Sequence, residues 1–422
     1  MTVAIDTVLR GLDGIRTQVE DLYRDLHAHP ELGLAETRTS ARVAERLRAE
    51  GYEVIDGIGG TGVIGVLTRG DGPTVLLRAD MDALPVAEAT GLPYASTVTA
   101  TDRSGRAVPV MHACGHDVHV ACLLGFAQLM AQAAPDAWQG TLVVLFQPSE
   151  ENGDGADAML ADGLVDRIPR PDVAFAQHVL PYPAGYVGVR AGAFLSAADS
   201  LRITLHGRGA HGSMPHAAVD PVVLAAMCVL RLQTIVSREV PPTTPAVLTV
   251  GSVTAGAGPN VIPETAVLEL NVRSYDDATR RRILEAIARC VRAESDASGA
   301  PREPSIEKLA QFPPTRNDAE VTARLDQAFR AHFGDGAGTV DPQTASEDFS
   351  EIPRALGAPY CYWAIGGADP DRYAEAERNG TVHQDIPVNH SAHFAPLIQP
   401  TLDTGITALA VAALAWLGHE AA

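Results

Sequence analysis

Apolar and polar residues follow two alternating patterns along the first half of the chain. Short runs rich in Val, Leu and Ile recur, and stretches with a helical spacing of apolar positions separate them. The expected strands cover residues 63–67, 74–78, 140–146 and 173–178, and the expected helices include 118–133 and 156–162. Buried strands separated by helices are typical of a sheet covered on both faces. We therefore predict an α/β fold with a mixed sheet flanked by helices.

The order of expected strands and helices changes at about residue 200. The expected elements there are strand 201–205, helix 221–237, strands 247–253 and 266–272, helix 280–298 and strand 305–309. This βαββαβ order fits a compact, smaller α+β domain. The α/β pattern then resumes, with an expected strand at 360–365 and an expected closing helix at 396–417. We expect a discontinuous larger domain, residues 1–196 and 310–422, interrupted by an insert, residues 197–309.

Length and charge narrow the possible functions. A chain of 422 residues exceeds the size at which one core usually stops growing, so two domains are expected. The formal net charge is −20, from 32 basic and 52 acidic residues, and no basic run interrupts it. Because such a surface repels phosphate backbones, we expect no nucleic-acid partner. The longest apolar stretch, 406–417, is too short to span a bilayer, so we expect no membrane partner.

Cysteine usage bears on the compartment. The five cysteines, at positions 114, 122, 228, 290 and 361, form no CxxC pair and no regular framework. The N-terminal segment is charged and amphipathic and lacks the apolar core of a secretory leader. We therefore expect reduced thiols and a cytoplasmic location.

The segment MHACGHDVH, residues 111–119, holds the densest set of metal-capable groups and lies at the start of an expected helix. Cys114 and His116 offer a thiolate and an imidazole, which suit zinc and its neighbours in the transition series. For this segment alone, a buried cysteine beside structural histidines is the alternative.

Two adjacent carboxylates, Glu150 and Glu151, follow the expected strand 140–146, at the end where α/β sheets place their ligands. Like charges side by side resist joint ionisation. A metal resolves this conflict, because Glu151 can ligate it while Glu150 moves protons. A solvated acidic turn is the alternative. His178 ends the strand 173–178, where a lone histidine is more often structural.

The C-terminal segment 389–393 adds two imidazoles, His390 and His393. The segments together supply one Cys, one Glu and three His ligands. This set is larger than a structural zinc centre needs and suggests two metals that share ligands.

Aspartates near these segments have two possible roles. Asp80 and Asp82 close the expected strand 74–78, and Asp117 lies within the segment 111–119. Their carboxylates can ligate a metal or can orient the ligating imidazoles from behind. We favour the orienting role.

Eight short motifs occur in order along the chain. They are HxHPE at 27–31, RADMDALP at 78–85, MHACGHD at 111–117, QPSEE at 147–151, AHGSMPH at 210–216, GPNVIP at 258–263, SEDF at 346–349 and NHSAHF at 389–394. Together they resemble the aminoacylase/carboxypeptidase superfamily of metallopeptidases, in particular the branch of hippurate hydrolase and indole-3-acetyl-amino-acid hydrolase. The resemblance covers nearly the whole chain.

The resemblance implies an amidohydrolase with two divalent metal ions (Zn, Mn, Co or Ni) that removes the acyl group from an N-acyl amino acid. Glu150 is the implied general base. The implied metal ligands are Cys114, His116, Glu151, His178 and His390. In the family pattern HSPxF, His390 is the ligand and His393 a variable position, although Ala392 here replaces the usual proline.

In this family the insert acts as a lid and carries dimer contacts, so a homodimer or higher homo-oligomer is implied. His211 resembles a histidine that reaches into the partner's active site and polarises the scissile carbonyl. Asn260 and Arg273 match positions that help to hold the substrate carboxylate, for which a guanidinium has the right bidentate geometry. A charge at a strand edge is the alternative for Arg273.

Three rival readings remain open. Cys114 could be a nucleophile, since histidines lie close in sequence, and insensitivity to chelators would reveal this. The same metals could serve a dipeptidase or carboxypeptidase, which a comparison of N-acetyl amino acids with dipeptides would reveal. A metal-dependent binding protein without catalysis is the third, and the presence of both Glu150 and Glu151 speaks against it.

Overall fold

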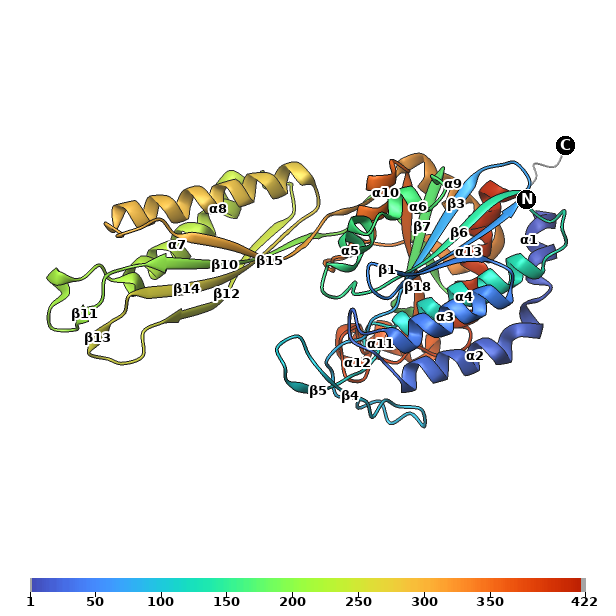
Figure 1. The fold of residues 1–422 in the computed structure, drawn as a ribbon, viewed down its shortest axis with the longest axis horizontal. Helices are drawn as coiled ribbons and strands as arrows, with labels where there is room; N and C mark the ends of the chain where they lie inside the picture. The colour runs from blue at the N-terminus through green and yellow to red at the C-terminus, as the bar shows by residue number, and fades with distance from the viewer. Residues whose placement is uncertain (1, 419–422) are drawn as a thin grey trace. The chain divides into compact units, whose positions relative to one another are not determined.

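The computed structural model describes residues 2–418 and divides into two compact units (Figure 1). The larger unit comprises Met1–Gly192, Asn317–Asp341 and Asp348–Ala422, and the smaller unit comprises Ala193–Arg316 and Pro342–Glu347. The two main crossings of the chain between units lie at 192/193 and 316/317, whereas the expected borders are at 196/197 and 309/310.

A mixed eight-stranded sheet forms the centre of the larger unit. Its spatial order is β1 (Glu53–Ile58), β2 (Gly62–Arg69), β6 (Gly140–Gln147), β3 (Thr74–Asp80), β7 (Val173–Pro183), β18 (Tyr360–Ala368), β8 (Val187–Val189) and β17 (Ala337–Thr339). The central strands β6, β3, β7 and β18 are parallel, whereas β1, β2 and β6 pair antiparallel. The predicted α/β class with a mixed sheet is confirmed.

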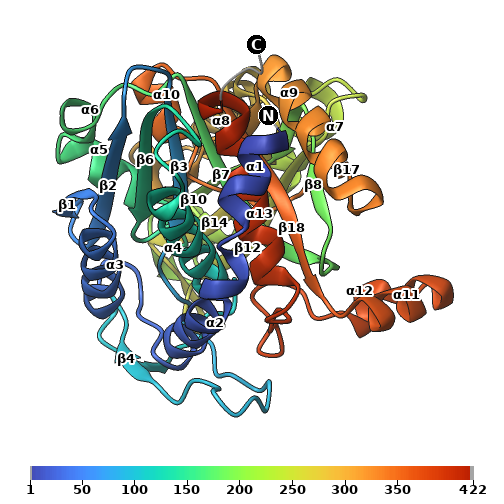
Figure 2. The same cartoon turned by 90° about the vertical axis from the view of Figure 1, so that its right-hand side faces the viewer.

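Both faces of this sheet are buried. On β6, Leu142, Val144 and Phe146 join one hydrophobic cluster, and the alternating residues Val143 and Leu145 are equally buried on the opposite face. Such residues bury apolar area on both sides, which explains the unbroken apolar runs in the sequence. Helices α2 (Leu12–Ala28), α4 (His116–Gln132) and α13 (Thr401–Leu417) lie together over one face (Figure 2).

The remaining elements of the larger unit are shorter or peripheral. They are α1 (Thr2–Leu9), α3 (Thr37–Ala49), β4 (Thr99–Thr101), β5 (Ala107–Pro109), α5 (Gly155–Ala161), α6 (Leu164–Arg167), α9 (Ala319–Phe333), α10 (Glu351–Leu356), α11 (Pro370–Asn379) and α12 (Val382–Asp385). Strands β9 (Gly192–Leu195) and β16 (Thr315–Asn317) contain the two main chain crossings. The expected helix 396–417 begins only at Thr401, because Pro400 at its N-cap position cannot continue a helix toward the N-terminus.

The smaller unit is built on an antiparallel sheet in the order β12 (Ala246–Ala255), β14 (Thr265–Ser274), β10 (Ala197–His206) and β15 (Ser305–Phe312). Helices α7 (Pro221–Glu239) and α8 (Asp277–Ala297) lie along the same side of this sheet (Figure 1). Along the chain the order is βαββαβ, as predicted. Two short strands, β11 (Ala210–His211) and β13 (Val261–Ile262), form a separate pair. By length and composition alone α7 could cross a bilayer, but its buried side chains pack into the core of this unit.

Candidate metal centre

The predicted metal-binding segments converge at one edge of the larger sheet. Cys114 and His116 lie at the N-terminus of α4, Glu150 and Glu151 follow β6, and His178 lies in β7. Since β3, β6 and β7 run parallel, the chain leaves them at the same edge, where open α/β sheets place their ligands.

Cys114 is common to two groups of potential ligands. The first group joins its Sγ to ring nitrogens of His116 and His178, and the second joins it to Glu151 and His390, with all atoms of each group within 4.8 Å of one another. Sγ of Cys114 lies 3.4 Å from Nε2 of His178, and Nε2 of His390 lies 3.2 Å from Oε1 of Glu151. The geometry thus offers two adjacent positions for cations that share one thiolate.

Glu150 borders both groups. Its Oε2 lies 3.9 Å from Nε2 of His116, and Oε1 of Glu151 lies at the same distance from that nitrogen. The Glu150 side chain is buried, with 7 % of its surface exposed. The structure therefore brings together all five predicted ligands and the predicted base.

Backbone carbonyls fix the tautomers of two imidazoles. Nδ1 of His116 donates to the carbonyl oxygen of Asp82 at 2.8 Å, and Nδ1 of His178 donates to that of Val179 at 2.8 Å. When the ring is neutral, each Nε2 therefore carries a lone pair. Nε2 of His116 is buried and has no hydrogen-bond partner among the described residues. A buried polar atom without a partner is costly, and a metal ion bound to this nitrogen in place of a proton would satisfy it.

Electrostatics also favour cations here. Burial opposes protonation of His116, but Asp80 and Asp82 outweigh it and raise its pKa to about 10. Burial and the neighbouring Glu151 hold the pKa of Cys114 well above its ordinary range. Without cations the thiol is therefore protonated at neutral pH and a poor nucleophile. Divalent ions would relieve the crowding of negative charge and stabilise the thiolate.

The three predicted orienting aspartates all bind protein donors. Both carboxylate oxygens of Asp82 accept backbone N–H groups, from Glu150 at 3.1 Å and from Glu151 at 3.0 Å. Asp117 accepts from Nδ1 of His27 at 2.6 Å. Asp80 accepts from Arg78 at 2.6 Å and from Nδ1 of His119 at 2.5 Å. These contacts hold the segments that carry the candidate ligands.

The loop that carries His390 is tied to the loop that carries Cys114. The backbone N–H of His390 donates to the carbonyl of Ala113 at 2.8 Å. The side-chain amide of Asn389 donates to the carbonyls of Cys114 and Val179, each at 3.1 Å. His390 itself has a positive φ of 69°, a conformation that these bonds maintain. Asn389 belongs to the NHSAHF motif, but nothing in the motif predicts that its side chain ties the two loops together.

His393 does not join either group. Its Nδ1 bonds the carbonyl oxygen of Ala89 at 2.9 Å. The side chain is exposed, and no candidate metal group among the described residues includes it.

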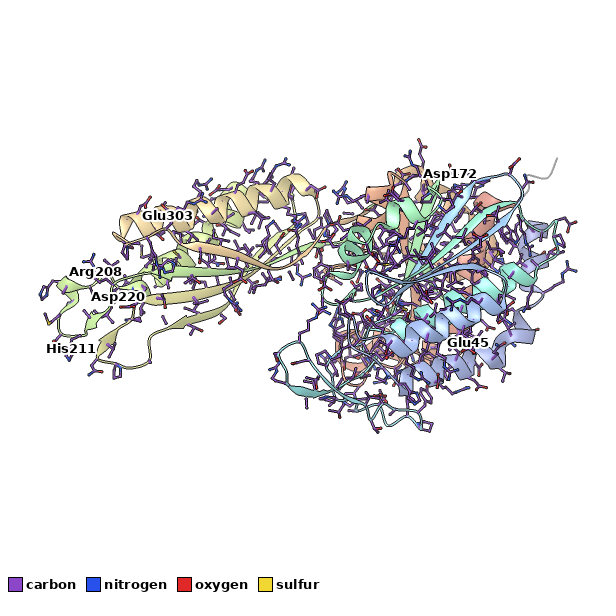
Figure 3. All side chains as sticks on the ribbon, viewed as in Figure 1. Glu45, Asp172, Arg208, His211, Asp220 and Glu303 are labelled. Atoms are coloured by element: carbon purple, nitrogen blue, oxygen red, sulfur yellow. The ribbon has the colours of Figure 1, made fainter. Side chains whose placement is uncertain are left out.

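His211 and Asn260 lie together at one end of the smaller unit, with Arg208 and Asp220 near them (Figure 3). The N–H of Gly212 donates to the carbonyl of Asn260 at 2.7 Å. Nδ1 of His211 accepts from the N–H of Ser213 at 3.1 Å, so the neutral ring carries its proton on Nε2. His211 is exposed and can present this Nε2–H as a donor.

Arg273 lies near the other end of β14, close to its last residue. The half-buried guanidinium donates to Asn271 at 2.9 Å and to the hydroxyl of Ser346 at 2.6 Å. No carboxylate of the described residues lies within ion-pair distance of it. Such a cation is available for an anion from outside the chain.

Comparison with known proteins agrees with this geometry. The model of peptidase family M20/M25/M40 matches residues 76–390. Hippurate hydrolase of Campylobacter jejuni is 37% identical over 79% of this chain and 85% of its own length. Thermostable carboxypeptidase 1 of Saccharolobus solfataricus is 34% identical over 89% of this chain and 91% of its own. A Bacillus subtilis structure, described as a dinuclear metal binding peptidase from the M20 family, superposes with a TM-score of 0.75 at 28% identity, over 95% of this chain and 98% of that one. The chain belongs to peptidase family M20/M25/M40.

Proposed function

We propose that this protein is a dinuclear, metal-dependent amidohydrolase that cleaves N-acyl amino acids to a carboxylic acid and a free amino acid. One observation carries the proposal: two ligand groups share Cys114, and Glu150 borders both of them. The substrate class rests on the similarity to hippurate hydrolase, whose name describes an N-acyl amino acid as substrate.

Cys114, His116 and His178 would hold one ion, and Cys114, Glu151 and His390 the other. This mixture of thiolate, imidazole and carboxylate accepts Zn, Mn, Co or Ni, so supply in the cell contributes to the choice of metal. When bound, two such cations lower the pKa of a water molecule and polarise the acyl carbonyl.

Glu150 then acts as the general base. Its carboxylate takes a proton from the water that attacks the acyl carbon, and returns the proton to the nitrogen of the leaving amino acid. The hydrogen bond from its backbone N–H to Asp82 holds the residue in place at the end of β6. Nε2–H of His211 would donate to the carbonyl oxygen as negative charge develops on it. Arg273, together with Asn260 from the chain that supplies His211, would bind the carboxylate of the amino acid.

His211 and Arg273 of one chain cannot reach the same small substrate. The β11–β13 pair that carries His211 lies beyond the Thr265 end of β14. Arg273 lies eight residues farther along that strand, about 27 Å at the usual rise per residue. If both contact one substrate, then His211 must come from a second copy, which makes the active form a homodimer.

An exposed apolar surface on the smaller unit suits that second copy. Val223, Met227 and Leu230 line one side of α7, with 59%, 45% and 67% of their surface exposed. Their spacing places them in one stripe along the helix. Strand β12 beside α7 is an edge strand, and its Val247 and Val253 are also exposed. An exposed apolar stripe on a helix and an unpaired strand edge are each typical of an interface.

A cytoplasmic location remains part of the proposal. All five cysteines are buried and unpaired in the structure, as in proteins of reducing compartments.

A substrate screen tests the proposed function. Metal-free protein reconstituted separately with Zn, Mn, Co or Ni should hydrolyse hippurate, N-acetyl-Met, N-acetyl-Leu or an indole-acetyl conjugate, and EDTA should abolish the activity. Turnover of simple dipeptides without turnover of any N-acyl amino acid would favour the carboxypeptidase or dipeptidase alternative. The 34% identity to a carboxypeptidase is the reason for testing this alternative. Full activity after prolonged chelation would point to the cysteine nucleophile, and no hydrolysis at all to a binding protein.

A further inference from the structure

His119 lies beside β7, beyond the point where the neighbouring strand β3 ends. Strand β3 ends at Asp80, and its last pair with β7 joins Arg78 to Ala176. Strand β7 continues to Pro183, so the backbone N–H of Val179 has no partner in β3. Nε2 of His119 accepts this N–H at 2.9 Å. The imidazole thus satisfies a buried backbone donor that would otherwise be costly to leave unpaired.

The second ring nitrogen of His119 is also engaged. Its Nδ1 lies 2.5 Å from Oδ1 of Asp80, whose Oδ2 accepts from Arg78 at 2.6 Å. Because Nε2 accepts an N–H, the ring proton is on Nδ1 and is donated to Asp80. Asp80, His116 and His119 come close enough together to hold a metal ion. However, both nitrogens of His119 are occupied, which leaves this ring no lone pair for a metal.

His119 lies directly against one of the candidate ligands. Its ring centroid is 4.5 Å from that of His178, and the two rings are nearly perpendicular, at 74°. The backbone of Val179 connects them as well, because its N–H donates to Nε2 of His119 and its carbonyl oxygen accepts from Nδ1 of His178. Rotation of the His119 ring or of the Val179 backbone would turn Nε2 of His178 away from Cys114.

We propose that His119 is a positioning residue that fixes the orientation of His178 through the backbone of Val179 and through ring contact. This inference rests on the proposed metal centre, in which His178 is a ligand. Partners that orient metal-binding histidines typically change metal affinity by about 10- to 100-fold when they are replaced. The bond from the N–H of Val179 to Nε2 of His119, rather than the bond from His119 to Asp80, is the one that holds the Val179 backbone beside His178.

Two variants separate the two bonds. In His119→Gln the side-chain oxygen reaches the place of Nε2 and can still accept from Val179. In His119→Asn the shorter amide can reach Asp80 but not Val179. Both lose the aromatic ring, so they differ chiefly in the bond under test. Tyr52→Phe is a matched control, because it removes another buried hydrogen bond to α4, from the Tyr52 hydroxyl to the carbonyl of Ala127 at 2.9 Å.

The measurement is titration of metal-free protein with Mn or Zn, followed by calorimetry and by the number of ions bound per chain. We expect His119→Asn to bind one of its two ions about 10- to 100-fold more weakly and His119→Gln to retain most of the affinity. Tyr52→Phe should lower the melting temperature without a change in either affinity. Equal affinities in His119→Asn and His119→Gln, or an equal loss in Tyr52→Phe, would overturn the inference. Two tightly bound ions without hydrolysis of any N-acyl amino acid would instead refute the proposed function and leave this inference standing.

Discussion

Glu36 lies beneath the turn that carries Glu150, and its replacement by Gln should change how stability depends on pH. The carboxyl group is buried and accepts from the N–H of Ser149 at 2.9 Å and from the hydroxyl of Thr61 at 2.6 Å. Ser149 has a positive φ of 50°, which these contacts help to maintain. Gln can keep both contacts but cannot ionise.

The size of the effect follows from the pKa of Glu36. Burial, and then the nearby Asp82, raise this pKa from 4.5 to about 7 in the metal-free protein. The difference corresponds to about 3 kcal/mol. Because the folded state binds the proton more tightly, this contribution is complete below the unfolded pKa and is lost as the pH rises through the folded one. The Gln variant should therefore gain about 3 kcal/mol over the natural protein between about pH 4 and pH 8.

Urea unfolding followed by tryptophan fluorescence provides the assay. The three tryptophans, Trp138, Trp363 and Trp416, all belong to the larger unit, so the signal reports on the unit that contains Glu36. Glu45→Gln is the control, since Glu45 lies exposed on α3 (Figure 3). A difference between the Glu36→Gln variant and the natural protein that stays constant over this pH range would refute the reasoning.

Three further predictions address the substrate, the dimer and the metals. Arg273→Met should raise KM by about 10- to 100-fold, because the substrate carboxylate loses charge-assisted hydrogen bonds; an unchanged KM would remove Arg273 from the site. A mixture of His211→Ala and Glu150→Gln chains, each inactive alone, should regain activity after subunit exchange, since one site per heterodimer then has both groups intact; no recovery would contradict a shared site. Removal of the metals should lower the melting temperature of the natural protein, and added Mn or Zn should restore it, because ions that bind only the folded state stabilise it. An unchanged melting temperature would argue against the centre.

The fold was largely predictable where periodicity was strong. Strand β10 alternates buried and half-buried residues, and α7 keeps one apolar face, so the βαββαβ order could be read from the sequence. The order of the larger sheet could not. Strand β18 lies beside β7 although about 180 residues separate them, and such pairing depends on tertiary packing rather than on local pattern.

The candidate site was predictable to the level of residue types. Cys114, Glu151 and His390 belong to short motifs that follow strands or begin a helix, and these segments do meet in space. The role of His119 was not predictable, because its partner is the backbone N–H of Val179, which no sequence motif marks. Glu36 gave no signal either, since its contact with Ser149 joins segments more than one hundred residues apart.

Glu150→Gln tests the central claim most directly. The side chain keeps its size, and its backbone bond to Asp82 does not depend on the carboxylate. Turnover of N-acyl amino acids and the number of bound metal ions should be measured on the same preparation. The account predicts two ions per chain, as in the natural protein, and no detectable turnover. Retained turnover in a variant that holds both ions would contradict it.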